Sequence, residues 1–149
     1  ESSPYLGMSQ QVENPMSPQS YLEKLEQAPP SSFHVLDPAK AKRMNAKTLF
    51  IPAPADVAKV ITAIPKGETR TIVDLRRELA VMGSAETACP AKTIKYWKWL
   101  AQATDELDGT DSIYGVPWWR VLKDGKPSRH MPGGIERQIA LLEDEGVKI

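Results

Sequence analysis

The chain has 149 residues, of which 26% are charged and 41% hydrophobic, and its 19 lysines and arginines balance its 19 acidic residues. This length predicts one ordinary domain with a core and a tail, and zero net charge leaves only a local patch for binding a polyanion. The apolar runs are too short for a membrane span, and the first ten residues lack the basic and apolar regions of a secretory signal.

The chain contains a single cysteine, Cys89, and two histidines that lie far apart, His34 and His130. One cysteine excludes an internal disulfide framework and is typical of a reducing compartment, so we expect a cytoplasmic protein. These three side chains do not form the ligand set of a zinc site. We therefore expect neither a metal ion nor a cofactor.

Residues 1–45 are rich in Pro, Ser and Gln and poor in apolar residues. Within them a short helix is predicted with Ser17 as its N-cap and Pro18 at its first position, ending before a pair of prolines. A second short helix is predicted after Asp37, which precedes a proline and can serve as a cap. We expect residues 1–45 to be an irregular N-terminal extension, partly ordered with short helices, and residues 46–149 to be the domain.

From residue 47 onward the chain has the apolar periodicity of a compact domain, beginning with a short apolar segment that ends at Pro52. Apolar residues at three- and four-residue spacing predict helices over residues 54–64, 71–80, 90–103 and 133–147, the last closed by Gly146. The residues predicted to face inward are Val57, Val60, Ile61, Ile64, Ile72, Leu75, Leu79, Ile94, Trp97, Leu100, Ala101, Ile135, Ile139 and Leu142. The helix at 71–80 has two candidate caps, Thr69 and Thr71.

Between the third and fourth of these helices, residues 116–122 predict a strand, and Lys-Asp-Gly-Lys at 123–126 predicts a tight hairpin turn. Helices, a short hairpin and a closing helix together predict a mostly α fold. We expect a winged-helix-like helix-turn-helix domain with a short β-hairpin wing, plus the irregular N-terminal extension.

The helix at 90–103 carries Lys92, Lys95 and Lys98 at three-residue spacing, and Arg70 lies shortly before the preceding helix. A row of flexible cations on the second helix of a helix-turn-helix is suited to phosphate binding, because lysine and arginine replace condensed counterions. The alternative is a solvated helix face without a ligand.

The segment Val-Pro-Trp-Trp-Arg-Val at 116–121 is followed by a Gly turn, a Gly-Gly pair and an apolar helix that ends in Glu-Gly-Val. Over residues 49–147 this order resembles the DNA-binding domain of the O6-alkylguanine-DNA alkyltransferases. It is most similar to the alkyltransferase-like proteins, which lack the reactive cysteine. True alkyltransferases have Pro-Cys-His-Arg-Val, so Trp118 stands at the cysteine position and Trp119 at the histidine position.

An indole is a poor nucleophile, so Trp118 cannot accept an alkyl group as a thiolate does, and we expect no enzyme activity. The resemblance implies that Trp118 and Trp119 line a pocket for a base, beside Arg120, which would fix the segment through hydrogen bonds to carbonyls. The alternative is that the two tryptophans alternate along a strand, one in the core and one at the surface.

The resemblance also implies a DNA-binding set on the two motif helices. Ile72 stands where the family has the tyrosine that displaces the target nucleotide, and Lys92 stands where it has the arginine that fills the gap. Thr93 and Lys95 replace small residues that allow close approach to DNA. The full set is Arg70, Thr71, Ile72, Lys92, Thr93, Lys95 and Tyr96.

These observations predict a non-enzymatic DNA-binding protein of the alkyltransferase-like type that recognises O6-alkylguanine without dealkylating it. Its expected partners are double-stranded DNA, including alkylated DNA, and a further DNA repair protein; we expect a monomer. One alternative is a domain reused for protein interaction or for general regulatory DNA binding. The other is an alkyl acceptor at Cys89, at the start of a helix whose dipole favours a thiolate.

Overall fold

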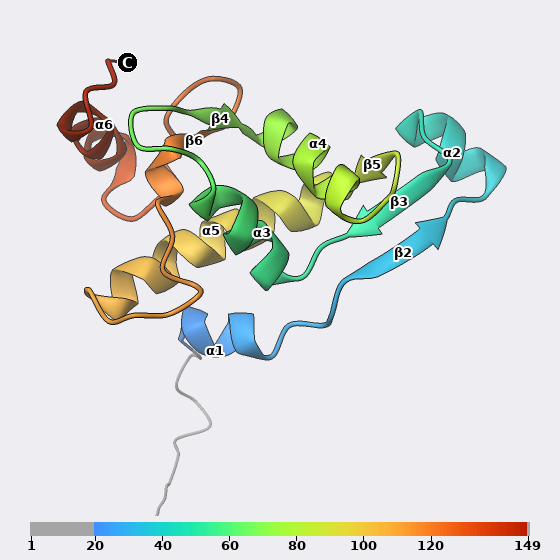
Figure 1. The fold of residues 1–149 in the computed structure, drawn as a ribbon, viewed down its shortest axis with the longest axis horizontal. Helices are drawn as coiled ribbons and strands as arrows, with labels where there is room; N and C mark the ends of the chain where they lie inside the picture. The colour runs from blue at the N-terminus through green and yellow to red at the C-terminus, as the bar shows by residue number, and fades with distance from the viewer. Residues whose placement is uncertain (1–19, 149) are drawn as a thin grey trace, which may run out of the picture.

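The computed structural model describes residues 20–148, and they form a mostly α structure (Figure 1). The α-helices are α1 (Tyr21–Glu26), α2 (Pro38–Met44), α3 (Pro54–Thr62), α4 (Ile72–Met82), α5 (Pro90–Leu107) and α6 (Gly134–Asp144). The strands are β2 (Ser32–Val35), β3 (Thr48–Ile51), β4 (Arg70–Thr71), β5 (Thr87–Ala88) and β6 (Val121–Leu122). No helix in the described part of the chain is long and apolar enough to cross a membrane.

The helix starts follow local capping chemistry. Asp37 caps α2 and Thr71, one of the two predicted threonines, caps α4. Helix α1 starts later than the sequence predicts, with Ser20 as its cap. The predicted cap Ser17 and its neighbour Pro18 lie outside the described residues.

The core is built around α5, the longest helix, which α3 and α4 cover on one side. Trp97 and Leu100 of α5 are fully buried, and they share the core with Val57 of α3 and Leu75 of α4. The predicted spacing therefore places the inward faces of these three helices correctly. Burial of such apolar surface supplies most of the driving force for the fold.

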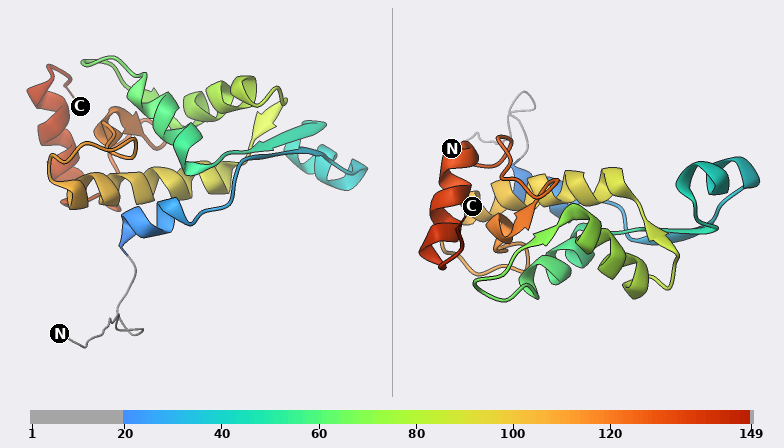
Figure 2. Two further views of the ribbon diagram at one scale, coloured as in Figure 1. Left: turned by 60° about the horizontal axis from the view of Figure 1, so that its bottom comes forward. Right: turned by 90° about the horizontal axis from the view of Figure 1, so that it is seen from above.

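Residues 20–45, which the sequence assigns to the extension, take part in this core and in the sheet. Leu25 of α1 is 1% exposed, and α1 lies along α5 in two different views (Figures 1 and 2). Strand β2 pairs antiparallel with β3, Phe33 opposite Phe50, and β5 pairs parallel on the other side of β3. Strand β2 was not predicted, and its two apolar residues, Phe33 and Val35, are 49% and 78% exposed.

The predicted hairpin is reduced to a tight turn. Asp124 and Gly125 have φ values of 54° and 74°, the positive pair of a two-residue hairpin turn, and Lys123 and Lys126 exchange both backbone hydrogen bonds. Pairing stops there, because the next two groups of the ladder, the Ser128 N–H and the Val121 carbonyl, bond to the Gln138 side chain instead of to each other. Strand β6 instead pairs in parallel with β4.

The predicted strand at 116–122 is wrong in its central part. Pro117 has φ −77° and ψ 67°, an inverse γ-turn in which the following N–H donates to the Val116 carbonyl at 2.8 Å. The chain then makes one 3-10 turn at Trp118–Arg120, and only Val121–Leu122 are extended. The proline bends the chain before a strand can form.

The final helix ends as predicted, but its buried face differs. Gly146 follows the helix with φ +87°, a conformation that favours glycine. Leu142 is buried and Ile139 half-buried, whereas Ile135 is 43% exposed and the core position belongs to Gln138, which is 0% exposed. The predicted inward role of Ile135 is therefore wrong, because hydrogen bonds of Gln138 orient this helix.

Candidate nucleic-acid interface

Helices α4 and α5 are joined by residues 83–89, which include strand β5. Arg76 of α4 fixes this connection: its Nε donates to the Ala88 carbonyl at 3.0 Å and its Nη2 to Thr87 Oγ1 at 3.2 Å. Gly83 begins the connection against the ring of Phe50, where a Cβ would clash. Arg76 therefore positions α5 from within the fold.

Of the residues predicted to contact DNA on α5, two are buried. Thr93 is 0% exposed and its hydroxyl donates to the Cys89 carbonyl at 2.7 Å, while Tyr96 is 1% exposed. Lys95 is exposed and Lys92 half-buried, so only the two lysines of the set present charge to solvent. The outer face of α5 is therefore a lysine face.

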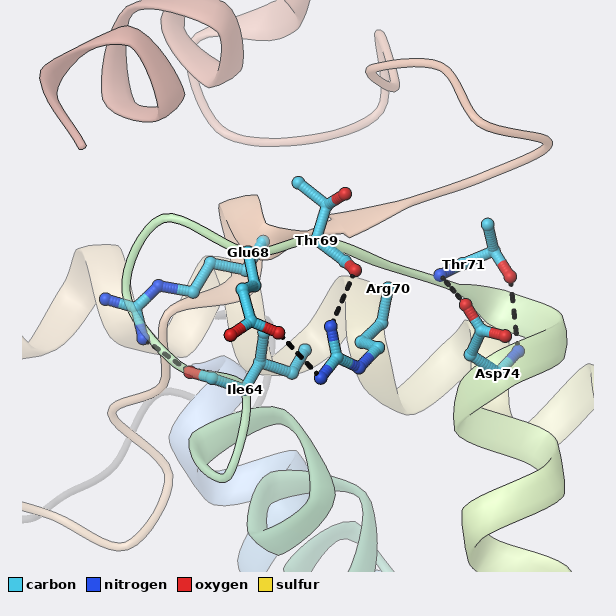
Figure 3. A network of polar contacts seen from close by, with 7 residues as sticks. Ile64, Glu68, Thr69, Arg70, Thr71 and Asp74 are labelled. Atoms are coloured by element: carbon cyan, nitrogen blue, oxygen red, sulfur yellow. Dashed lines mark hydrogen bonds and ion pairs between the residues drawn. The ribbon is translucent and has the colours of Figure 1, made fainter. Parts of the chain in front are cut away.

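The three residues predicted at the start of α4 have mainly structural contacts, and Figure 3 shows those of Arg70 and Thr71. The Arg70 guanidinium donates to the Thr69 carbonyl at 2.9 Å and pairs with Glu68 at 3.1 Å. Thr71 and Asp74 form a reciprocal cap, and the hydrogen bond from the Thr71 N–H holds the pKa of Asp74 below its usual value. Ile72 is 7% exposed and belongs to the core, so it does not project toward a ligand.

A second group of cations lies beside α5. We call Lys123, Lys126, Arg129 and His130 the basic loop; all four are exposed and none was predicted as a site residue. Lys98 of α5 is the largest cause that lowers the pKa of His130, and Arg129 and Lys123 lower it further. The basic loop and the middle of α5 are therefore electrostatic neighbours.

The tryptophan pair is divided between core and surface. Trp118 is 2% exposed, and its carbonyl accepts a hydrogen bond from Trp97 Nε1 at 3.1 Å. Trp119 packs against it edge to face, with ring centroids 5.8 Å apart, and lines two open hollows of about 420 and 200 Å³. This arrangement matches the alternative in which one tryptophan lies in the core and the other at the surface. It arises from a 3-10 turn, however, and not from alternation along a strand.

Arg120 joins three parts of the fold, as a structural residue of this segment is expected to do. Its Nη1 donates to the Ile64 carbonyl at 2.7 Å, and its Nε and Nη2 donate to the Glu145 carboxylate at 2.7 to 3.3 Å. These hydrogen bonds hold the pKa of Glu145 below its ordinary value. Trp119 Nε1 lies close enough to contribute to that shift, but no described acceptor gives this buried N–H a well-formed hydrogen bond.

Gln138 completes the support of the tryptophan segment, and it was not among the predicted site residues. Its Nε2 donates to the carbonyls of Trp119 at 3.1 Å and Val121 at 2.8 Å, and its Oε1 accepts from the Ser128 N–H at 2.9 Å. A lone polar residue on the inner face of a predicted amphipathic helix is the only sequence signal for this role. Gln138 thus ties Ser128, next to Arg129 of the basic loop, to the tryptophan segment.

Cys89 precedes α5 and is half-buried, and its N–H donates to the Phe50 carbonyl at 2.9 Å. Its side chain makes no capping hydrogen bond. Within residues 20–148, no group of three His, Cys, Asp or Glu side chains is placed to hold a metal ion.

No known protein family, no curated protein and no solved structure gives a match to this chain. The class of site is therefore defined by its geometry: a helix with an exposed lysine face, a neighbouring basic loop and a half-exposed tryptophan.

Proposed function

We propose that this protein is a non-enzymatic DNA-binding protein of the alkyltransferase-like type, which binds duplex DNA through α5 and the basic loop. The observation that carries the proposal is the row of lysines on α5, Lys92, Lys95 and Lys98. The charges of Lys98, Arg129 and Lys123 all lower the pKa of His130, so the basic loop lies within electrostatic range of that row. Cations gathered from two segments repel one another, and a polyanion relieves that repulsion. A helix and an adjoining turn that contact one duplex together are typical of winged helix-turn-helix proteins.

The lysines of this surface are not neutralised by ion pairs within the protein. No carboxylate lies within 4.0 Å of Lys92, Lys95, Lys98 or Lys123 in the described part of the chain. If those four lysines each neutralise one phosphate, the logarithm of the binding constant falls against the logarithm of salt concentration with a slope of about −3.6. Zero net charge means that this affinity depends on the patch alone.

Two features support the absence of catalysis. The residue at the acceptor position, Trp118, is packed in the core, where its indole offers neither a thiolate nor access to an alkyl group. The position of the activating histidine is taken by Trp119, whose N–H is only a donor. A role in DNA repair would therefore consist of binding and of marking a site for another protein.

Recognition of O6-alkylguanine is a second candidate, which the larger hollow at Trp119 favours. This hollow of about 420 Å³ is lined by Trp119, Pro117 and Arg120, and an indole face can stack on a flat base. It also reaches Thr104, twelve residues after Lys92 and therefore about 18 Å away along α5. Lesion recognition and phosphate binding are thus separable by mutation.

The test is fluorescence anisotropy of a labelled duplex, with and without one O6-methylguanine, titrated at two salt concentrations. Lys98→Gln and Lys123→Gln should each weaken binding and make the salt slope shallower by about 0.9, because each removes one phosphate contact. Lys59→Gln, an exposed lysine on α3, is the matched control. Failure of the protein to bind any duplex at low salt would refute the proposal and favour a protein-interaction module.

For the second candidate, Trp119→Ala should abolish any preference for the modified duplex and leave binding of the unmodified duplex intact. Equal affinity of the wild-type protein for both duplexes would exclude lesion recognition. Trp118→Ala is not a clean probe, because it opens a cavity in the core.

A further inference from the structure

A groove between α1 and α5 carries the largest group of aromatic-supported lysines in the described part of the chain. It has a volume of about 220 Å³ and is lined by Lys24, Lys92, Lys95, Tyr96 and Trp99, together with Gln27, Ala28 and Pro29. Helix α1 lies outside the region that resembles alkyltransferases. The resemblance to alkyltransferases therefore does not imply this groove.

Helix α1 is fixed at its place along α5. The Glu106 carboxylate near the end of α5 accepts hydrogen bonds from the Tyr21 and Leu22 N–H groups at 3.1 and 3.2 Å, and Leu25 is 1% exposed in the core. Because the start of α1 meets the end of α5, the two helices run antiparallel. This direction brings Lys24 to Trp99, about two turns before Glu106.

Aromatic rings, rather than carboxylates, hold the three lysines of the groove. Lys24 Nζ lies 4.6 Å from the Tyr21 ring centroid and 5.8 Å from that of Trp99. Lys95 Nζ lies 4.6 Å from the Trp99 centroid, and Lys92 Nζ lies 5.7 Å from that of Tyr96. Cation–π contacts position an ammonium group without cancelling its charge, which a carboxylate would do.

The acidic residues of α1 do not pair with the groove lysines. Glu23 accepts a hydrogen bond from the Ser20 N–H at 3.0 Å as part of the helix cap, and the exposed Glu26 forms no ion pair with a groove lysine. No carboxylate in residues 20–148 lies within 4.0 Å of the groove lysines. The groove therefore presents three oriented positive charges.

From this arrangement we infer that the α1–α5 groove is a phosphate-binding site for the backbone of nucleic acid, with Lys24 extending the surface of α5. The inference rests on the proposed function, because it assigns α1 to the same duplex. Lysine binds phosphate as a compact point charge, and three such charges suit the closely spaced phosphates of one strand. The rings are occupied by the lysines, so the groove reads no base and adds affinity without sequence preference.

The experiment measures anisotropy of a labelled unmodified duplex over a series of salt concentrations, with the full chain and with Lys24→Gln. We expect the variant to bind roughly threefold to tenfold more weakly and to have a salt slope shallower by about 0.9. Lys24→Arg should retain the wild-type slope because it keeps the charge. The control is Lys40→Gln on α2, which lies at the right-hand end of the molecule in Figure 1, away from α1.

A second variant, Trp99→Leu, keeps all three charges and removes the ring between Lys24 and Lys95. It should weaken binding with an unchanged slope, provided that circular dichroism shows an intact fold. An unchanged slope for Lys24→Gln, with wild-type duplex binding present, would overturn this inference and leave the proposed function standing. Absence of wild-type duplex binding would overturn both, and competition by poly-glutamate as strong as by duplex would assign the groove to an acidic protein.

Discussion

Arg120 offers the sharpest test of how the tryptophan segment is held. Its ion pair with Glu145 has a shortest N–O distance of 2.7 Å, and the two side chains are 14% and 9% exposed. Removal of one partner from a buried pair costs about 3–5 kcal/mol, because the other charge stays without compensation. Arg120→Ala also leaves the Ile64 carbonyl without its donor. Since some exposure remains, we expect a loss of about 3–4 kcal/mol.

At this chain length, about 2–4 °C of melting temperature corresponds to each kcal/mol, so Arg120→Ala should lower Tm by roughly 6–16 °C in calorimetry. The control is Arg77→Ala. Arg77 pairs with Asp74, and because these side chains are 71% and 37% exposed, their ion pair should contribute less than about 0.5 kcal/mol to stability. Equal losses for the two variants would refute the assignment of Arg120 as a buried structural residue.

The Arg120–Glu145 ion pair also predicts how the stability of the fold depends on pH. The pKa of Glu145 is lower in the folded chain than its ordinary 4.5, mainly because Arg120 donates hydrogen bonds to it. A carboxyl group with a lowered folded pKa stabilises the fold above the unfolded pKa, and this contribution is lost as pH falls through the folded pKa. The difference in stability between wild type and Arg120→Ala should therefore narrow below about pH 4.5. If the stability difference between wild type and Arg120→Ala stayed constant from pH 7 to pH 3, the ion pair with Glu145 would not be its cause.

Three further predictions concern residues around the site. Gln138→Leu should lower stability by about 2–3 kcal/mol in urea unfolding, because two buried backbone groups and one partly buried one lose their partner, and a loss under 1 kcal/mol would disprove that role. The pKa of His130 lies below its ordinary 6.5, first because of Lys98, so the unfolded chain protonates more readily and stability falls as pH drops below 6.5. Bound phosphate would raise that pKa, so duplex affinity should increase from pH 8 to 6, and His130→Gln should remove the increase. Incubation with an O6-methylguanine duplex should leave the protein mass unchanged; a methyl adduct on Cys89 would show that the chain is an alkyl acceptor.

The helices were predictable because their stabilisation is local. Asp37 and Thr71 cap helices from within four residues, and the apolar spacing of α3, α4 and α5 is set by one helical period. The strands were harder to predict, because β2 pairs with a segment on the far side of α2 and β6 pairs with β4, about fifty residues earlier. Two-residue strands carry no period that a sequence can display.

The candidate site was predictable only as a set of charges. Lys92 and Lys95 lie on the exposed side of α5, as the spacing indicates, but Thr93 and Tyr96 lie in the core. Exposure at these positions depends on how α1, α3 and α4 pack around α5, which a helical period does not specify. The basic loop was missed for the same reason, since its relation to Lys98 arises only when the chain folds back on α5.

Arginine and lysine have different tasks in this molecule, and the difference bears on every experiment above. All four ion pairs of the described residues use an arginine: Arg70, Arg77, Arg120 and Arg137. Arg76 is likewise bonded inside the fold. A planar guanidinium suits fixed partners in two directions, whereas a lysine ammonium on a flexible stem suits an external phosphate. Replacement of an internally bonded arginine such as Arg120 should therefore change stability first, and replacement of lysines on α1, α5 and the basic loop should change binding and its salt dependence at nearly constant stability.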